Sequence, residues 1–146
     1  MADPFPLVDV AVVLIADPRG ERMLADYNPG WGSFTLPMTK VGELPPAAPG
    51  GAAAAEVLGR PVAAAALVRL DVDVPPYQQS GRDGAWKRYR YHLFATRLEI
   101  DPHPLPGHAA VWLTPAEWAT HEPVAPTARH VLAVASLADV LAAVGG

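Results

Sequence analysis

The stretch that decides the fold is WGSFTLPMTKVGELPPAAPGGAAAAEVLG, residues 31–59. Within it, the β-forming residues 33–36 are closed by a proline, which predicts a short strand. Residues 39–51 contain repeated prolines and glycines, which resist regular structure. Residues 52–58 are rich in alanine and are followed by a glycine and then a proline, the residue types that typically end a helix. The stretch therefore predicts a strand, a loop and a helix in succession.

Other strands and helices are expected on both sides of this stretch. Residues 8–16 form a β-branched run that ends at an Asp-Pro-Arg-Gly turn, and residues 21–26 become apolar again, so we expect a hairpin. Residues 127–144 have apolar side chains at helical spacing, which predicts an amphipathic C-terminal helix. The remaining expectations, in chain order, are a mostly β segment at 62–74, a loop at 75–85, the clearest strand at 86–98, a short strand at 110–113 and a helical turn at 114–117.

This order of elements predicts an α+β fold, in which one helix follows the third strand and another ends the chain. We expect an α/β/α sandwich built on a mixed β-sheet, and not an alternating parallel sheet. The chain has 146 residues, of which 51% are hydrophobic, so one core is expected. No internal repeat or linker divides the sequence, and residues 1–146 are predicted to form a single domain.

Composition excludes several classes of function. The sequence has 11 basic and 15 acidic residues, a net charge of −4, which argues against a protein that binds polyanions through bulk positive charge. It has no cysteine, so a disulfide, a thiolate metal site and a cysteine nucleophile are all excluded. No signal peptide or membrane-spanning run is recognisable, and we expect a soluble, cytoplasmic protein.

Two motifs, taken with the order of elements, resemble those of the Nudix hydrolase superfamily. Residues 31–37, WGSFTLP, resemble the aromatic-containing strand that reaches a proline just before the glycine-rich loop of a Nudix domain. Residues 112–117, WLTPAE, resemble the aromatic-leucine-x-x-x-glutamate stretch that precedes the final helix of that fold. The resemblance covers nearly the whole chain, and it implies a Nudix-fold sandwich with one box helix and a C-terminal helix.

The Nudix box itself is degenerate in this sequence. The box runs G-x5-E-x7-R-E-U-x-E-E-x-G-U, where U is a bulky aliphatic residue, and its glutamates hold a divalent cation, usually Mg²⁺, on a diphosphate. In this chain Glu43 matches the first glutamate and Glu56 matches the first residue of the glutamate pair. Ala52, Ala53 and Val57 stand where the pattern has arginine, glutamate and the second paired glutamate. The resemblance therefore implies Glu43 and Glu56 as catalytic and metal-binding residues, in a site that has lost most of its carboxylates.

A second group of candidate residues lies on the strand predicted at 86–98. Alternation along a strand places Arg88, Arg90 and His92 on one face, together with Phe94 and Thr96. Arginine side chains suit phosphate or carboxylate groups because their planar fork can donate two hydrogen bonds at once. This face is a candidate ligand-binding surface, and the alternative is a solvated sheet face whose arginine stems cover apolar neighbours.

Further candidates lie outside these two groups. Lys40, in the loop of the degenerate box, is a candidate for a phosphate contact, and Glu99, near the end of the long strand, is a candidate metal ligand if the protein is an active enzyme. Tyr27, Trp31 and Phe34 are candidates for stacking on a planar ring of a ligand, and the alternative for each is packing in the core or a loop.

These observations leave three hypotheses about function. The first is a Nudix-like pseudoenzyme that binds a nucleotide or another phosphorylated small ligand with little or no pyrophosphohydrolase activity. The second is a divergent Nudix hydrolase that uses Mg²⁺ to cleave a substrate linked through a nucleoside diphosphate. The third is a protein-interaction domain, favoured by the prolines and the four tryptophans. Whether the chain is an enzyme, has a protein partner or forms a homodimer is left open by the sequence.

Overall fold

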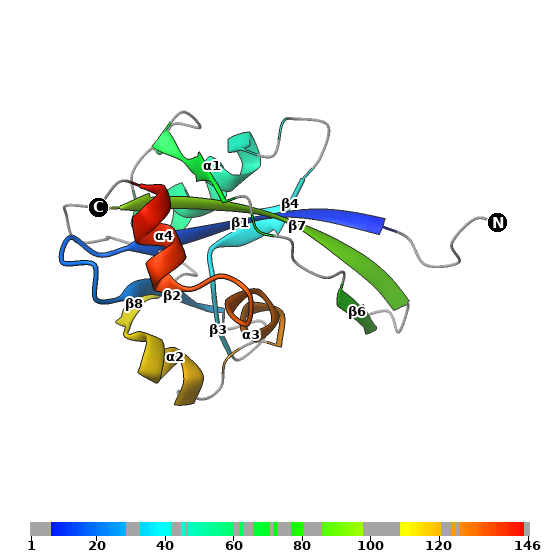
Figure 1. The fold of residues 1–146 in the computed structure, drawn as a ribbon. Helices are drawn as coiled ribbons and strands as arrows, with labels where there is room; N and C mark the ends of the chain where they lie inside the picture. Colours follow the sequence, from blue (N-terminus) through cyan, green and yellow to red (C-terminus); the bar gives the residue numbers. More distant parts are fainter. Residues whose placement is uncertain are drawn as a thin grey trace.

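The computed structural model describes residues 7–28, 33–41, 45, 47–59, 62, 66–70, 72, 77–80, 86–97, 109–120, 124 and 126–144 (Figure 1). The described strands form one eight-stranded mixed sheet. Its strands are β1 (Leu7–Ala16), β2 (Met23–Asn28), β3 (Ser33–Thr35), β4 (Met38–Lys40), β5 (Val68–Arg69), β6 (Tyr77–Ser80), β7 (Trp86–Arg97) and β8 (Ala110–Leu113). The helices are α1 (Ala47–Leu58), α2 (Pro115–Thr120), α3 (Pro126–Leu132) and α4 (Leu137–Ala143).

The two longest strands, β1 and β7, form the centre of the sheet. They run parallel and stay in register from Leu7 opposite Arg88 to Ala16 opposite Arg97. On one side of this pair, β4 and β2 run antiparallel to β1, and β2 in turn pairs with β3 and β8. On the other side, β5 and β6 run antiparallel to β7. The sheet is therefore mixed, as the sequence predicts.

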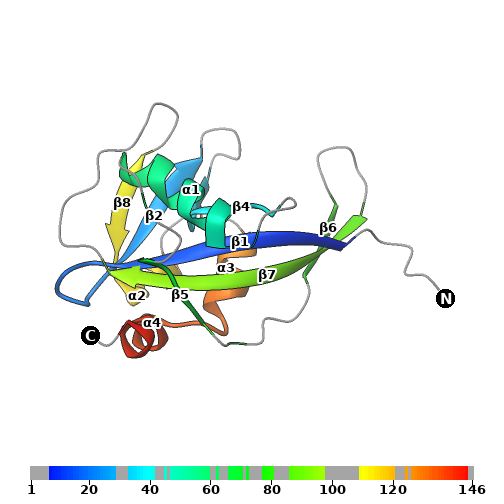
Figure 2. The same ribbon diagram turned by 90° about the horizontal axis from the view of Figure 1, so that it is seen from above.

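Helices cover both faces of the sheet, with α1 on one side and α2, α3 and α4 on the other (Figure 2). Alternate residues of β1 separate the two cores. Ala11, Val13 and Ile15 pack with α1, whereas Val10, Val12 and Leu14 belong to the larger core that includes the residues of α3 and α4. The prediction of an α/β/α sandwich is confirmed.

The predicted alternation along β7 is also confirmed. Tyr91, Leu93 and Ala95 belong to the larger core, and Phe94 packs on the opposite face with α1. Because successive side chains of a strand point to opposite faces, Arg90 and His92 share the α1 face with Phe94. They lie beyond the part of that face where α1 covers β1.

Two segments that the sequence assigns to loops contain regular structure. Residues 39–51 were expected to be irregular, but β4 includes Thr39 and Lys40, and α1 begins at Ala47 instead of residue 52. Pro49 is tolerated because it lies in the first turn of α1, where its missing N–H has no partner within the helix. Within the predicted loop 75–85, β6 pairs with the N-terminal end of β7. Of the mostly β segment predicted at 62–74, the described part contains only the short strand β5.

The predicted C-terminal helix is two helices, α3 and α4. The break follows α3, and Ser136 then acts as the N-cap of α4. The backbone N–H of Asp139 donates to the Ser136 side chain, and the Asp139 carboxylate accepts from the backbone N–H of Ser136, which is a capping box. The apolar positions still face the core, since Val131 and Val140 are fully buried.

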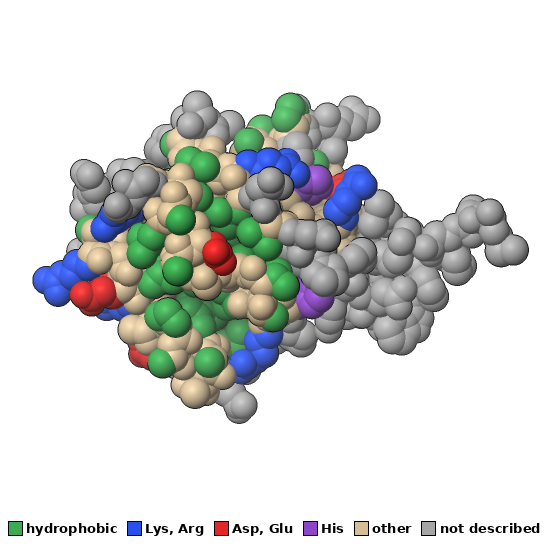
Figure 3. Space-filling view, viewed as in Figure 1, with side chains coloured by type: hydrophobic (Ala, Val, Ile, Leu, Met, Phe, Trp, Pro, Cys, Tyr) green, Lys and Arg blue, Asp and Glu red, His purple; other side chains and the backbone are tan. Residues whose placement is uncertain are grey.

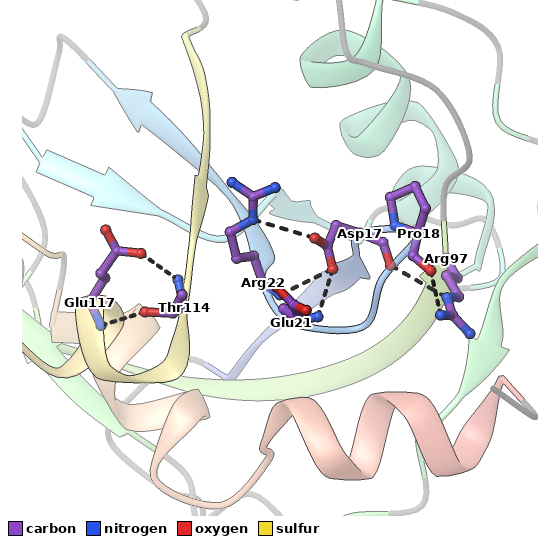
Figure 4. A network of polar contacts seen from close by, with 7 residues as sticks. All are labelled: Asp17, Pro18, Glu21, Arg22, Arg97, Thr114 and Glu117. Atoms are coloured by element: carbon purple, nitrogen blue, oxygen red, sulfur yellow. Dashed lines mark hydrogen bonds and ion pairs between the residues drawn. The ribbon is translucent and has the colours of Figure 1, made fainter.

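The turn between β1 and β2 is organised by Asp17, which is almost fully buried (Figure 4). Its carboxylate accepts hydrogen bonds from the backbone N–H groups of Glu21 and Arg22 and from the Arg22 side chain. Its backbone carbonyl accepts from Arg97 at the end of β7. The turn is thus joined both to the next strand and to the neighbouring parallel strand.

The start of α2 follows the sequence prediction closely. Thr114 accepts a hydrogen bond from the backbone N–H of Glu117, whose carboxylate accepts from the backbone N–H of Thr114 (Figure 4). In the described part of the chain, no helix is long and apolar enough to cross a membrane.

Candidate functional site

A pocket of about 180 Å³ lies beside α1, between this helix and the strands on the β2 side of the sheet. Its described lining comes from β2, from β4 and the proline before it, and from α1. The lining residues are Asp26, Pro37, Met38, Thr39, Pro49, Ala52, Ala53, Glu56 and Val57. Apart from Asp26, the pocket is therefore built from the segment in which the sequence predicts a degenerate box.

The five lining residues of α1 are a buried pair, an exposed pair and the half-buried Pro49. Ala53 and Val57 are buried, and Val57 packs in the core on the α1 side of the sheet. Ala52 and Glu56 are exposed, and they are four residues apart, so their side chains lie next to each other on the helix surface. The helix ends before Gly59, which has a φ of +71°, a conformation that favours glycine. Glu56 thus lines the pocket, and no second carboxylate accompanies it on the helix.

A second carboxylate in this pocket, that of Asp26 on β2, was not predicted from the sequence. Its exposed fraction is 6%, and one carboxylate oxygen accepts a hydrogen bond from the backbone N–H of Ala109 at 3.2 Å. The adjoining residues Met23, Leu24 and Ala25 are all buried and apolar. A single acidic residue in such a strand is unusual because burying a charge is costly, and that was the signal available in the sequence.

The chemistry of the pocket follows from this lining. Among its described lining residues, two are carboxylic acids and none is Lys, Arg or His. A phosphate group placed directly against two carboxylates would be repelled, but a divalent cation between them would reverse that interaction. Mg²⁺ usually keeps several waters and binds through one or two carboxylates together with substrate phosphates, so Asp26 and Glu56 fit such an ion only with a phosphorylated ligand. Within the described residues, no group of three or more Asp, Glu, His or Cys could hold a metal ion.

Three other candidates lie on the opposite face of the sheet from the pocket. Lys40 is exposed and lies opposite Val10, a residue of the larger core, whereas its neighbour Thr39 lines the pocket. Tyr27 and Phe34 are paired across β2 and β3, with ring centroids 5.1 Å apart in an edge-to-face arrangement. Phe34 packs against the larger core, so the two rings contact each other away from Glu56.

Arg90 and His92 lie on the same face as α1 but contact Asp9 of β1. The Arg90 guanidinium donates to both carboxylate oxygens of Asp9, at 2.6 and 3.2 Å, and His92 Nε2 lies 3.0 Å from Asp9 Oδ1. These hydrogen bonds, first from Arg90 and then from His92, hold the pKa of Asp9 below its ordinary value. Arg88 lies on β7 two residues earlier, opposite Leu7.

The remaining candidates fall outside the described residues. These are Glu43, Trp31 and Glu99. Of the proposed carboxylate ligands, the structure therefore places Glu56 alone, and it adds Asp26. The aromatic pair, the box pocket and the arginine-bearing strand occupy three separate places on the sheet.

Comparison with solved structures decides what fold this arrangement is. A MutT protein from Methanosarcina mazei Go1 matches with a TM-score of 0.66 and 16% sequence identity, over 89% of this chain and 92% of that chain. The Nudix hydrolase RenU from M. smegmatis matches with a TM-score of 0.59 and 17% identity, over 86% and 80% of the two chains. The chain has the Nudix fold.

A third match comes from a structure of the complex between the C-terminal domain of mouse MUTYH and human PCNA. It has a TM-score of 0.61 and 18% identity, and the match covers 86% of this chain and 85% of that chain. No family model matches the sequence, and no curated protein matches it. At these low identities the likeness to the Nudix structures is one of fold, and the function has to be argued from the site.

Proposed function

We propose that this Nudix-fold protein binds a nucleotide or another phosphorylated small ligand in the pocket beside α1, with little or no pyrophosphohydrolase activity. The observation that carries the proposal is the replacement of the box arginine and glutamate by Ala52 and Ala53 in the wall of a pocket that still contains Glu56. Replacing the glutamate removes a carboxylate from the site, and the small alanine side chains leave space in the pocket.

Binding is supported by the composition of the pocket. Pro37, Met38 and Pro49 supply apolar surface, and Thr39 supplies a hydroxyl. Small-molecule sites commonly combine an apolar lining with a few polar groups that fix orientation. The two carboxylates recruit Mg²⁺ with the ligand's phosphates, so the ligand and the ion are expected to bind together.

The same residues give a reason to expect little or no hydrolysis of a bound diphosphate. Hydrolysis of a diphosphate requires the protein to position the cation, the phosphates and the attacking water within a narrow geometry. With Glu56 the only carboxylate on α1, the position of the cation would be set largely by water and by the ligand itself. The site can then hold a phosphorylated ligand without orienting a water molecule for attack.

One observation favours a second candidate, a divergent Nudix hydrolase. Asp26 is a buried carboxylate from outside the box, and it lines the same pocket as Glu56. A carboxylate supplied by β2 compensates for part of what α1 lacks, and its hydrogen bond from Ala109 fixes its orientation. In this alternative, Asp26 and Glu56 together hold Mg²⁺ on a nucleoside diphosphate-linked substrate.

A thermal-shift screen with nucleotides and nucleotide sugars, with and without Mg²⁺, followed by a phosphate-release assay, tests the proposal. We expect a Mg²⁺-dependent rise in Tm with at least one ligand and no product above the buffer rate. Both Asp26→Asn and Glu56→Gln should abolish the rise. The matched control Glu21→Gln changes an exposed glutamate in the β1–β2 turn and should leave it intact.

The other outcomes of this screen are also informative. Mg²⁺-dependent turnover that disappears in Glu56→Gln would establish the divergent hydrolase instead. No response to any ligand would overturn both candidates and favour the protein-interaction domain.

A further inference from the structure

Four polar side chains form a hydrogen-bonded row on the side of α1 away from the pocket. The row runs from Arg69 on β5 through His92 on β7 and Asp9 on β1 to Arg90 on β7. Arg69 Nη2 lies 3.4 Å from His92 Nδ1, His92 Nε2 lies 3.0 Å from Asp9 Oδ1, and Arg90 holds both oxygens of Asp9. Figure 3 shows basic, histidine and acidic side chains side by side above the middle of the view.

The partners of His92 define how its ring is protonated. An arginine guanidinium has only N–H donors and no acceptor, so His92 Nδ1 must be the acceptor in its contact with Arg69. The ring is then neutral, and Nε2 carries the proton that is donated to Asp9. At 3.4 Å the Arg69 contact is a weak hydrogen bond, whereas the Asp9 contact at 3.0 Å is a normal one.

Protonation of His92 would change the end of the row nearest Arg69. Nδ1 would then carry a proton of its own, and two donors, both positively charged, would face each other. Asp9 would remain hydrogen-bonded to Nε2 and would stabilise the charged ring. Arg69 is exposed, and among the described residues it has no acidic partner, so its side chain can turn outward without losing an ion pair.

Two charged donors that converge on one point are the arrangement that binds an oxyanion. We propose that Arg69 and His92 form a second ligand site, which binds a phosphate-type oxyanion together with one proton taken up by His92. The anion oxygens accept from the Arg69 guanidinium and from His92 Nδ1–H, and the repulsion between the two cations is relieved. Arg90 adds positive charge nearby, while Asp9 fixes the orientation of both His92 and Arg90.

The site is separate from the pocket of the proposed function. Asp26 and Glu56 lie towards β2 and β4, whereas Arg69 and His92 lie towards β5 and β7, on the other side of β1. Among the described residues, the charged groups that face His92 are Asp9 from β1, Arg69 from β5 and Arg90 from its own strand. β6 contains no charged residue, and the only ionisable residue of α1 is Glu56, in the pocket.

Calorimetric titration of the full chain with inorganic sulfate tests this proposal, because sulfate keeps its charge across the relevant pH range. We expect sulfate to bind more tightly at about pH 5.5 than at about pH 8, because binding takes up a proton. The affinity should fall by up to about tenfold per pH unit, as for binding linked to one proton. Titration in two buffers of different ionisation enthalpy should show proton uptake on binding.

Single substitutions distinguish sulfate binding at this site from nonspecific attraction of sulfate to positive charge. Arg69→Gln should abolish sulfate binding, and His92→Gln should remove its pH dependence, whereas Arg19→Gln, an exposed arginine in the β1–β2 turn, should change neither. Glu56→Gln should also leave sulfate binding unchanged, so failure of this site and failure of the proposed function are distinguishable.

A measurement on the unaltered protein tests the proposal even if the variants do not fold. In NMR spectra, saturating sulfate should move the pH midpoint of the His92 ring resonances upward. Sulfate binding that is independent of pH, a midpoint that does not move, or binding that survives in a folded Arg69→Gln variant would each overturn the proposal.

Discussion

Asp9 and Arg90 lie directly opposite each other on the parallel strands β1 and β7, and their side chains form a two-pronged ion pair. Arg90 remains more than half exposed, with 58% of its side chain accessible, but its fork is directed at a carboxylate of the same protein. From the sequence, Arg90 is a candidate for binding a ligand's phosphate. In the structure, a phosphate at Arg90 would have to compete with Asp9, and Arg69 is the arginine of this face that has no acidic partner among the described residues.

The Asp9–Arg90 pair should make stability depend on pH. The hydrogen bonds from Arg90 and His92 lower the pKa of Asp9 from its ordinary value of 3.8, so the ionised carboxylate stabilises the folded state. This contribution is fully present above the ordinary value and is lost as the pH falls through the lower pKa of the folded state. Asp9→Asn should therefore cost a small amount of stability at neutral pH, because the pair is partly exposed, and almost none in strong acid. Urea unfolding of both proteins across this range measures the difference, and a deficit that grows towards low pH would contradict the assignment.

Asp17 should matter more than Asp9, because it is buried and holds the β1–β2 turn. Burial alone would raise its pKa, but hydrogen bonds from the Arg22 and Glu21 backbone and from the Arg22 side chain outweigh burial and lower it. Asp17→Ala leaves two backbone N–H groups without their acceptor and should reduce the free energy of unfolding by about 1–3 kcal/mol at neutral pH. The deficit should shrink as acid protonates Asp17 in the unaltered protein. An unchanged unfolding midpoint in urea at neutral pH would rule out this role.

Two pocket-lining residues of α1, Val57 and Ala52, should respond differently when each is replaced by glutamate. Val57 is buried in the core, so Val57→Glu should destabilise the fold by several kcal/mol, about 3 or more, as expected for an unpaired buried charge. Ala52 is exposed and lies one turn before Glu56, so Ala52→Glu should fold and cost only about 0.2–0.5 kcal/mol by repulsion between like charges.

The Ala52→Glu variant also tests the electrostatics of the pocket. Mg²⁺ should abolish the small loss of stability of Ala52→Glu. When Mg²⁺ is titrated, the Tm of this variant should rise more than the Tm of the unaltered protein. Ala52→Gln has a similar size without the charge and serves as the matched control. An equal response of Ala52→Glu and Ala52→Gln to Mg²⁺ would show that the carboxylates of this pocket do not bind a cation.

Much of the fold could be predicted from local patterns. The apolar, β-branched run of β1 predicts a strand buried on both sides, and alternation along β7 predicts which of its residues share a face. The N-terminal part of α1 could not be predicted, because Gly50 is unfavourable in an isolated helix. In the folded protein α1 packs closely on β1 there: a Cβ on Gly50 would lie 3.5 Å from Val13 and 3.6 Å from Ala11. Tertiary packing thus overrides the local preference.

The site was harder to predict than the fold. Glu56 could be named because the box pattern marks its position in sequence. Asp26 and Arg69 belong to no motif, and they become relevant only because the sheet brings β2 beside the box segment and β5 beside β7. Contacts between residues so far apart in the chain carry no local sequence signal.

Mg²⁺-dependent turnover of a bound ligand is the decisive test of whether this Nudix-fold protein binds a phosphorylated ligand without hydrolysing it. The measurement takes the nucleotide or nucleotide sugar that raises Tm most, at saturating concentration with Mg²⁺, and follows product release by the unaltered protein and by Glu56→Gln. We expect the ligand to raise the Tm of the unaltered protein, Glu56→Gln to abolish this rise, and neither protein to release product above the buffer rate. Turnover by the unaltered protein that is lost in Glu56→Gln would contradict this expectation.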